Sequence, residues 1–246
     1  MNELIRRAAL PAVPHVRIEP GAVIGDGVVF AEAGRAETVV RAGARIEADS
    51  AIGGGVEIGP GARVRPGSVV TTSVPANAVV EGDPAEVLGF VDARRVAPPP
   101  EAEAPAVLPL GDGGAAVHRM RRVREARGDL IFGETLRDLP FAPRRWFVVT
   151  GVPAREARGA HAHWRSHQFL VCVHGSCRAL VDDGRSRWEA TLDAPDVGVY
   201  MPPLTWGTQY RFSPDAALLV LASDAYDPDD YIRDYESLSA ARRDRS

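Results

Sequence analysis

A six-residue period in the first half of the chain constrains its fold more than any other feature of the sequence. From Val40 onward an aliphatic residue recurs at every sixth position, and a small residue or valine follows it four positions later. A fixed short period indicates that each unit forms one flat side of a coil, with the aliphatic side chain turned inward onto its equivalents. The aliphatic positions are Val40, Ile46, Ile52, Ile58, Val64 and Val70, and the positions that follow them are Ala44, Ser50, Val56, Ala62 and Ser68.

The same period begins before Val40. Ile18, Ile24 and Phe30 are six residues apart, and a slip of four residues between Gly34 and Val40 indicates a small loop. Nine units, at about three to a coil, predict roughly three coils. Over residues 15–92 the pattern resembles the left-handed β-helix of hexapeptide-repeat acyltransferases.

The resemblance to acyltransferases implies their activity only in part. Acetyltransferases of this family use a histidine as general base for the amine of an acceptor sugar, and residues 15–92 contain only His15, which precedes the first repeat. We therefore expect a non-catalytic remnant, with a residual sugar N-acetyltransferase as the alternative. So few coils leave apolar surface open, which predicts that this part of the chain self-associates.

Residues 93–117 are rich in proline, alanine and glycine. They include the run Ala-Pro-Pro-Pro-Glu-Ala-Glu-Ala-Pro after Val96 and the run Gly-Asp-Gly-Gly at 111–114. Such a composition does not build a hydrophobic core and favours extended or polyproline geometry. It predicts a linker between a first domain at 15–92 and a second domain at 118–240.

The second domain reads as short strands separated by turns, which is typical of a β-sandwich or barrel. The expected strands are 146–149, 169–173, 177–181, 188–192, 198–201, 209–212 and 217–221. Asp183-Gly184 predicts a tight hairpin turn between two of them, because both residues tolerate a positive φ.

A helix is expected near the end of the chain. Asp227 and Pro228 have the residue types of a helix cap and first turn. The expected apolar face of this helix consists of Tyr231, Ile232, Tyr235 and Leu238. The predicted fold class is therefore all-β: a short left-handed parallel β-helix, followed by a jelly roll with a C-terminal helix.

Three of the six histidines lie within seven residues, at His161, His163 and His167. Histidine is the only side chain whose ordinary pKa is close to neutrality, so the cluster indicates either a metal site or proton chemistry. His161 and His163 are two residues apart and therefore point to the same face of a strand. We expect the two imidazoles to share one wall of a cavity.

A His-x-His pair on a strand begins the metal motif of cupins, which this segment resembles. That motif continues with a glutamate and a later histidine, but here Gln168 stands at the glutamate position and residues 198–206 contain no histidine. A neutral amide is a poor ligand for ions that take imidazole and carboxylate. His167 would supply a third imidazole only if residues 164–166 form a bulge. We therefore expect neither a metal nor another cofactor.

Six linked motifs in the second domain resemble the dTDP-4-keto-6-deoxyglucose 3,4-ketoisomerases, which are metal-free cupins of deoxyaminosugar pathways. The motifs are Arg158-Gly159-x-His161-Ala162-His163, His167-Gln168, Val171-Cys172-Val173-x-Gly175-Ser176-Cys177, Asp182-Asp183-Gly184, Pro202-Pro203-x-x-Trp206-x-x-Gln209-Tyr210 and Tyr226-Asp227-x-x-Asp230-Tyr231-Ile232-Arg233-Asp234-Tyr235. Some members carry a hexapeptide-repeat acetyltransferase in front of the cupin, and this chain is similar to them in domain order. It departs from the family at Thr150, near where some isomerases carry a tyrosine.

The resemblance implies an isomerase acting on a dTDP-linked keto-deoxysugar. Moving a ketone from C4 to C3 needs a base for the C3 proton, an enediol, and an acid for C4, and two neighbouring imidazoles serve both steps. We expect His163 to handle the carbon-bound proton and His161 to shuttle between the oxygens, or the reverse. The expected substrate-binding residues are Arg158 for the diphosphate, Gln168 for a sugar hydroxyl, Tyr200 or Trp206 for a flat apolar wall, and Gln209.

The alternative is a repurposed or non-catalytic cupin that binds a nucleotide sugar or another biosynthetic intermediate. A net charge of −4 gives no basis for nucleic-acid binding, and no apolar run approaches membrane-spanning length. Residues 1–10 lack the apolar core of a signal peptide, and Cys172 and Cys177 are interpreted as reduced thiols, which predicts a cytoplasmic chain. We expect a homo-oligomer: a trimer through the β-helix, or a hexamer if the cupin domains also pair.

Overall fold

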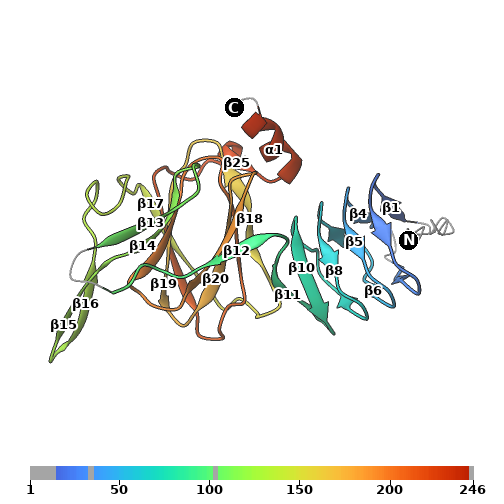
Figure 1. The fold of residues 1–246 in the computed structure, drawn as a ribbon, viewed down its shortest axis with the longest axis horizontal. Coiled ribbons are helices and arrows are strands. Elements are labelled where there is room, and N and C mark those ends of the chain that lie inside the picture. Colours follow the sequence, from blue (N-terminus) through green and yellow to red (C-terminus); the bar gives the residue numbers. More distant parts are fainter. Residues whose placement is uncertain (1–14, 33–35, 102–104, 244–246) are drawn as a thin grey trace, which may run out of the picture. The chain divides into compact units, whose positions relative to one another are not determined.

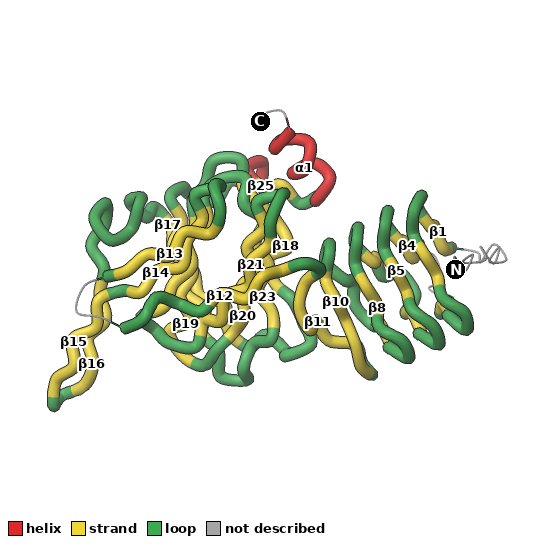
Figure 2. The backbone as a smooth tube through the Cα atoms, viewed as in Figure 1, coloured by secondary structure: helices red, strands yellow, loops and turns green. Residues whose placement is uncertain are grey.

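The chain forms two compact units, Met1–Ala85 and Glu86–Ser246. The computed structural model describes residues 15–32, 36–101 and 105–243. The predictions made from residues 1–10 and from Gly34 lie outside these ranges. Strands make up most of the regular structure, and the α-helix α1 lies near the C-terminus (Figure 2). No helix within the described ranges is long and apolar enough to cross a membrane.

The first unit is a parallel β-helix with three faces (Figure 1). One face stacks β1 (Val16–Ile18), β4 (Thr38–Val40) and β7 (Glu57–Ile58). The next face contains β2 (Val23–Ile24), β5 (Arg45–Ile46), β8 (Arg63–Val64) and β10 (Ala78–Gly82). The third face stacks β3 (Val29–Phe30), β6 (Ala51–Ile52) and β9 (Val69–Val70). Successive coils are in parallel register, so Ile46 lies beside Val64.

The interior of the β-helix consists of the repeating aliphatic positions. Val40, Ile46, Ile52, Ile58, Val64 and Val70 are at most 1% exposed, and the small residues that follow them are also buried. The coils approach so closely that a Cβ on Gly25 would lie 2.7 Å from the backbone nitrogen of Ala48. A Cβ on Gly59 would lie 2.6 Å from that of Ala76. The predicted β-helix is confirmed, and its period is the period of its core.

The second unit contains two six-stranded sheets that face each other as a cupin jelly roll. The first sheet has the spatial order β12 (Ala93–Val96), β21 (Arg187–Leu192), β20 (Cys177–Asp182), β23 (Trp206–Tyr210), β18 (Arg158–His163) and β25 (Tyr231–Ile232). The second has the order β13 (Ala106–Leu110), β14 (Ala115–Arg119), β22 (Val197–Met201), β19 (Gln168–His174), β24 (Ala217–Ala222) and β17 (Arg145–Thr150). Leu170, Ala179, Val199 and Leu218 are among the fully buried residues of the core. The predicted all-β class is confirmed.

Two further elements belong to neither sheet of the jelly roll. β11 (Ala85–Phe90) precedes the sandwich along the chain. A hairpin of β15 (Arg121–Glu125) and β16 (Gly128–Phe132) forms its own two-stranded sheet. β15 contains three arginines, Arg121, Arg122 and Arg124, and Arg122 pairs with Asp129 of β16.

The segment predicted as a linker, 93–117, differs from that prediction. Its described residues contain β12, β13 and β14, and the division between the two compact units falls at Ala85 instead. β12 pairs with β21 in parallel, and β13 pairs with β14 along an outer edge. An edge strand tolerates Pro109 because its missing N–H is not needed by a neighbour. Of the described prolines in this segment, only Pro109 lies in a strand, while Pro98 to Pro100 connect β12 to β13. The segment therefore contributes edge strands to the sandwich and is not a free linker.

The predicted C-terminal helix is confirmed, but it begins later in the chain than expected. Asp227 caps only a short 3₁₀ turn, Pro228–Asp230, by accepting a hydrogen bond from the backbone N–H of Asp229 at 3.0 Å. Residues Tyr231–Ile232 then form β25, and α1 begins only at Tyr235 and ends at Arg243. The apolar residues assigned to one helix face are thus divided between a strand and a helix, because β25 pairs with β18.

The stacked core predicts a strong dependence of stability on its aliphatic side chains. Ile58 is fully buried, so Ile58→Ala is expected to lower the free energy of unfolding of the β-helix by about 2 to 5 kcal/mol. Ile18→Ala is the matched control, because Ile18 is 41% exposed in the first strand. Urea unfolding monitored by circular dichroism measures both variants. Equal effects at the two positions would contradict a core built from the repeat.

Candidate functional site

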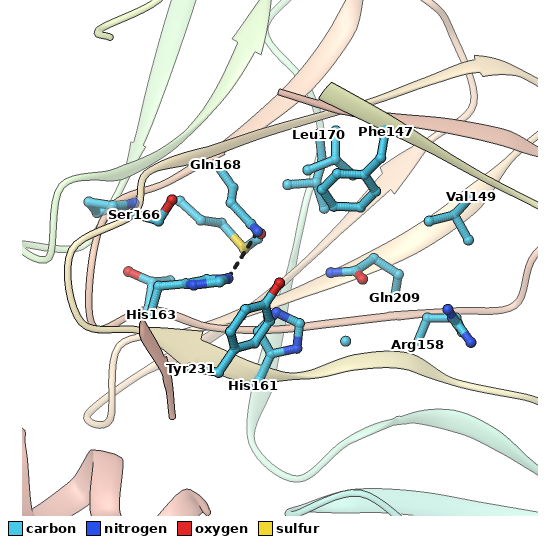
Figure 3. A pocket seen from close by; sticks show the side chains of 16 residues that line it. Phe147, Val149, Arg158, His161, His163, Ser166, Gln168, Leu170, Gln209 and Tyr231 are labelled. Atoms are coloured by element: carbon cyan, nitrogen blue, oxygen red, sulfur yellow. Dashed lines mark hydrogen bonds between the residues drawn. The ribbon is translucent and has the colours of Figure 1, made fainter. Parts of the chain in front are cut away.

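A cavity of about 200 Å³ lies inside the second unit, between strands of its two sheets. Strands β17, β18, β19, β23 and β25 all contribute side chains to it (Figure 3). The polar side chains include Arg158, His161, His163, Gln168, Gln209 and Tyr231, and the apolar ones include Phe147 and Val149. A concave site with apolar walls and a few convergent polar groups is typical of small-molecule binding.

Strand β18 carries both predicted histidines into the cavity. Its pairing with β23 shifts between Gly159 and His161, where Ala160 has a φ of 53°. Gly159 has a φ of 82°, and a Cβ there would lie 2.7 Å from the carbonyl oxygen of Gly207, so the position requires glycine. Beyond this bulge the rings of His161 and His163 meet edge to face, with centroids 5.0 Å apart. The two imidazoles therefore lie together on one wall.

His163 has a partner at each ring nitrogen. Its Nδ1 lies 3.1 Å from Oδ2 of Asp230, and its Nε2 lies 3.0 Å from Nε2 of Gln168. A carboxylate accepts hydrogen bonds and an amide nitrogen donates them. This arrangement therefore fits the neutral tautomer with its proton on Nδ1 and its lone pair on Nε2.

Asp230 is a buried carboxylate held by backbone N–H groups. The N–H of Arg165 donates to Oδ1 at 2.8 Å and that of Ser166 donates to Oδ2 at 3.1 Å. The N–H of Trp164 donates to the carbonyl oxygen of Asp230 at 2.9 Å. A carboxylate fixed against Nδ1 of an imidazole orients the ring and stabilises its protonated form. Asp230 is thus placed to position His163.

Burial lowers the pKa of both histidines on this wall. Burial is the main reason why the pKa of His161 falls to about 4, and the charges of Arg233 and Arg145 lower it further. Burial also lowers the pKa of His163, while the carboxylate of Asp230 opposes that shift. Both imidazoles are therefore neutral at pH 7 and able to accept a proton.

Three of the predicted substrate-binding residues lie in the same cavity as the histidines. Figure 3 shows Gln168 beside His163 at one end of the cavity. Arg158 and Gln209 lie toward the other end. The arrangement separates an amide next to the imidazoles from a guanidinium farther along the cavity. A ligand with a reactive end and an anionic end fits that separation.

The structure corrects the prediction for Tyr200 and Trp206, neither of which lines the cavity. The hydroxyl of Tyr200 lies 2.7 Å from Nδ1 of His167, and the two rings stack. Trp206 is buried against Tyr235, with ring centroids 5.2 Å apart. Strand β23 begins at Trp206 rather than at Gln209, and their odd spacing points the two side chains to opposite faces.

The candidate metal ligands do not converge. His167 turns to Tyr200, away from the other two imidazoles. Across the described ranges of the chain, no group of three His, Cys, Asp or Glu side chains is placed to hold a metal ion. At the position where a cupin glutamate would stand, Gln168 directs an amide nitrogen toward Nε2 of His163.

The sequence did not identify the side chains that β17 and β25 bring to the cavity. Phe147 and Val149 form an apolar wall across from the histidines (Figure 3). Tyr231 packs on both imidazoles, with ring centroids 4.9 Å from His161 and 4.4 Å from His163. The sequence around Tyr231 has helical spacing, which does not indicate this role. The position of Tyr231 depends instead on the pairing of β25 with β18, which are distant in sequence. The apolar run 146–149 predicted a strand, but it did not indicate which face of the strand turns inward.

The chain is similar to a curated protein of related chemistry. The TDP-4-oxo-6-deoxy-alpha-D-glucose-3,4-oxoisomerase of Aneurinibacillus thermoaerophilus is 41% identical over 121 residues. The match covers 49% of this chain and 87% of that protein. It therefore spans nearly the whole relative and about half of this chain.

Solved structures of sugar 3,4-ketoisomerases are similar as well. A 3,4-ketoisomerase from Helicobacter canadensis is 33% identical with a TM-score of 0.51, and the match covers 52% of this chain and 97% of that one. QdtA from Thermoanaerobacterium thermosaccharolyticum, solved in complex with TDP, is 32% identical with a TM-score of 0.53. That match covers 55% of this chain and 98% of QdtA.

Family models match both halves of the chain. Residues 37–72 match the bacterial transferase hexapeptide model (six repeats). Residues 114–243 match the FdtA model, described as WxcM-like, C-terminal, and this range contains every residue of the cavity. Both matches confirm the resemblances that the sequence motifs carry. With more than half of its length inside the second model, the chain belongs to the FdtA family of WxcM-like C-terminal domains.

Proposed function

We propose that this chain is a sugar 3,4-ketoisomerase that moves the ketone of a TDP-4-keto-6-deoxyhexose from C4 to C3. The observation that carries the proposal is the pair of neutral, adjacent imidazoles in one cavity, one of them bound to a buried carboxylate. Similar chains support the substrate class, since one is a TDP-4-oxo-6-deoxyglucose oxoisomerase and another was solved with TDP-4-keto-6-deoxyglucose.

The reaction needs two proton transfers at adjacent carbons. A base takes the proton from C3, and the electrons of that C–H bond form an enediolate with its negative charge on the C4 oxygen. The proton of the C3 hydroxyl then passes to the C4 oxygen, and delivery of the first proton to C4 leaves the ketone at C3. Positioned acid–base groups typically contribute about 10² to 10⁴ in rate. Two imidazoles with centroids 5.0 Å apart reach both carbons of such a unit.

We assign the carbon-bound proton to His163. On accepting it, His163 becomes an imidazolium whose Nδ1–H already points at Asp230, so the carboxylate stabilises the charge. The Nε2 lone pair faces the amide of Gln168, which a sugar hydroxyl must displace or share. His161, whose pKa burial lowers to about 4, serves as the shuttle between the oxygens.

The rest of the cavity suits the other parts of the substrate. Arg158 provides a guanidinium for the diphosphate, which it can bind through two parallel hydrogen bonds. Gln209 offers both a donor and an acceptor to sugar hydroxyls. Phe147 and Val149 supply the apolar wall that sequence reasoning had assigned to Tyr200 or Trp206.

The proposed reaction is tested in deuterated water with TDP-4-keto-6-deoxyglucose as the substrate. We expect NMR to detect a new 3-keto sugar that carries solvent deuterium. His163→Asn and His161→Asn should each lower the rate by about 10² to 10⁴, because each removes one acid–base group. His174→Asn is the control, since its side chain is 71% exposed and pairs with Asp215. Absence of the 3-keto sugar, or a wild-type rate for His163→Asn, would refute the proposal.

The role of Asp230 is tested separately. Its carboxylate raises the pKa of His163 against the effect of burial, so Asp230→Asn should lower that pKa further. We also expect kcat to fall by about 10²-fold, since the imidazolium loses its stabilising charge. NMR titration of the His163 ring gives the pKa, and Asp227→Asn, at an exposed pair with Arg165, is the control. A pKa of His163 that stays constant or rises in Asp230→Asn would contradict this role.

We also propose a cytoplasmic homo-oligomer held by the β-helix. Its third face stacks Val29, Ala51 and Val69 in register on the outside, and Val29 is 60% exposed. An apolar stripe of this kind favours contact with another copy, and a trimer or a hexamer is expected. Two unpaired cysteines, Cys172 and Cys177, support a reducing compartment.

Light scattering tests the oligomer. The wild-type chain should have three or six times the mass of one chain, and Val29→Glu should reduce it by placing a charge in the stripe. Val123→Glu, on the separate hairpin, provides a comparison at another exposed valine. A wild-type mass of one or two chains would exclude a trimer through the β-helix.

A further inference from the structure

We propose that the phenol of Tyr231 is a third catalytic group of the cavity. Its hydroxyl donates a hydrogen bond to the C4 oxygen of the sugar, where negative charge develops as the C3 proton leaves. The proposal rests on the proposed isomerase function. It adds a residue that stabilises charge on the C4 oxygen, whereas the histidines transfer protons.

Backbone pairing fixes Tyr231 beside the two histidines. Strand β25 pairs with β18, and the register sets Tyr231 directly opposite His163. The ring lies 4.4 Å from the imidazole of His163 and 4.9 Å from that of His161, centroid to centroid. Because Tyr231 touches both, a sugar held against the imidazoles also lies within reach of its hydroxyl.

The hydroxyl of Tyr231 is free to bind substrate. Figure 3 shows it pointing into the cavity, and within the part of the chain that the structure describes no hydrogen bond to it is found. Two other phenols of this unit already have partners: Tyr200 with His167 at 2.7 Å and Tyr235 with Asp182 at 2.5 Å. Tyr210 is buried outside the cavity lining. Tyr226 is 63% exposed, outside the cavity lining.

The chemistry requires a donor at this place. Removal of the C3 proton puts negative charge on the C4 oxygen, while the imidazoles are committed to moving protons. A hydrogen bond from a fixed phenol stabilises that charge without net transfer, so the phenol keeps its proton and no other reactant is needed.

The electrostatic surroundings favour negative charge beside Tyr231. Arg233 lies over the Tyr231 ring, with its guanidinium carbon 4.5 Å from the ring centroid. Arg145 stacks on Phe147 at 5.3 Å in the same region of the unit. Both cations act on the histidines, whose pKa values they lower. The same charges stabilise an anionic oxygen held between Tyr231 and the imidazoles.

Two other hydroxyls compete for the same role. The Oγ of Ser166 and the Oγ1 of Thr205 are buried without a hydrogen-bond partner, and both residues line the cavity. Serine and threonine lack a ring, so neither side chain makes the ring contacts that hold Tyr231 against both imidazoles. The test must therefore compare all three.

Steady-state kinetics with TDP-4-keto-6-deoxyglucose separate these groups. Tyr231→Phe keeps the ring and removes only the donor, so kcat should fall by about 10² to 10³ while KM changes by less than threefold. Deuterium exchange at C3 should fall in the same proportion, because the anion forms in that step. Ser166→Ala and Thr205→Val should lose less than tenfold, and Tyr226→Phe should keep the wild-type rate.

Each outcome decides the assignment. If kcat of Tyr231→Phe stays within threefold of an active wild type, Tyr231 is only a packing residue and this proposal alone fails. A loss of two orders of magnitude in Ser166→Ala or Thr205→Val, with Tyr231→Phe little affected, assigns the donor to that hydroxyl instead. A wild-type chain that forms no 3-keto sugar overturns both the isomerase function and the role of Tyr231.

Discussion

The pairing of β25 with β18 is the contact on which the site depends. Two residues of β25 and the turn before it bring Asp230 and Tyr231 against the histidines of β18. The backbone of Trp164 and Arg165 binds Asp230 in return, so each segment fixes the other. Without this edge strand His163 would lack its carboxylate, and the cavity would be open on one side.

Where the sequence determines structure through short-range order, prediction succeeds. The β-helix core follows from a six-residue spacing, because each inward residue is set by its own repeat and stacks on its equivalents. Position on a strand likewise places His161 and His163 on one wall, since two residues return a strand to the same face. Gln168, Arg158 and Gln209 belong to the motifs that carry the family resemblance, and all three line the cavity.

Long-range pairing accounts for what could not be predicted. Tyr231, Tyr235 and Leu238 have helical spacing, yet β25 exists because β18 offers an edge. Asp230 follows the predicted cap residue Asp227 in the sequence, and only the pairing of β25 with β18 brings it to His163. Trp206 was assigned to the site as a flat apolar wall, but its odd spacing from Gln209 turns it to the other face of β23. In each case the decisive partner is distant in sequence.

The low pKa values of the histidines have a consequence for the direction of catalysis. Burial leaves both imidazoles uncharged at neutral pH, so between turnovers the site holds no spare proton. A cycle must begin with removal of a proton from the sugar, and it ends with the same neutral pair. The same neutral pair can therefore accept a proton from either the 4-keto or the 3-keto sugar, so one resting form of the site serves both directions of the reaction.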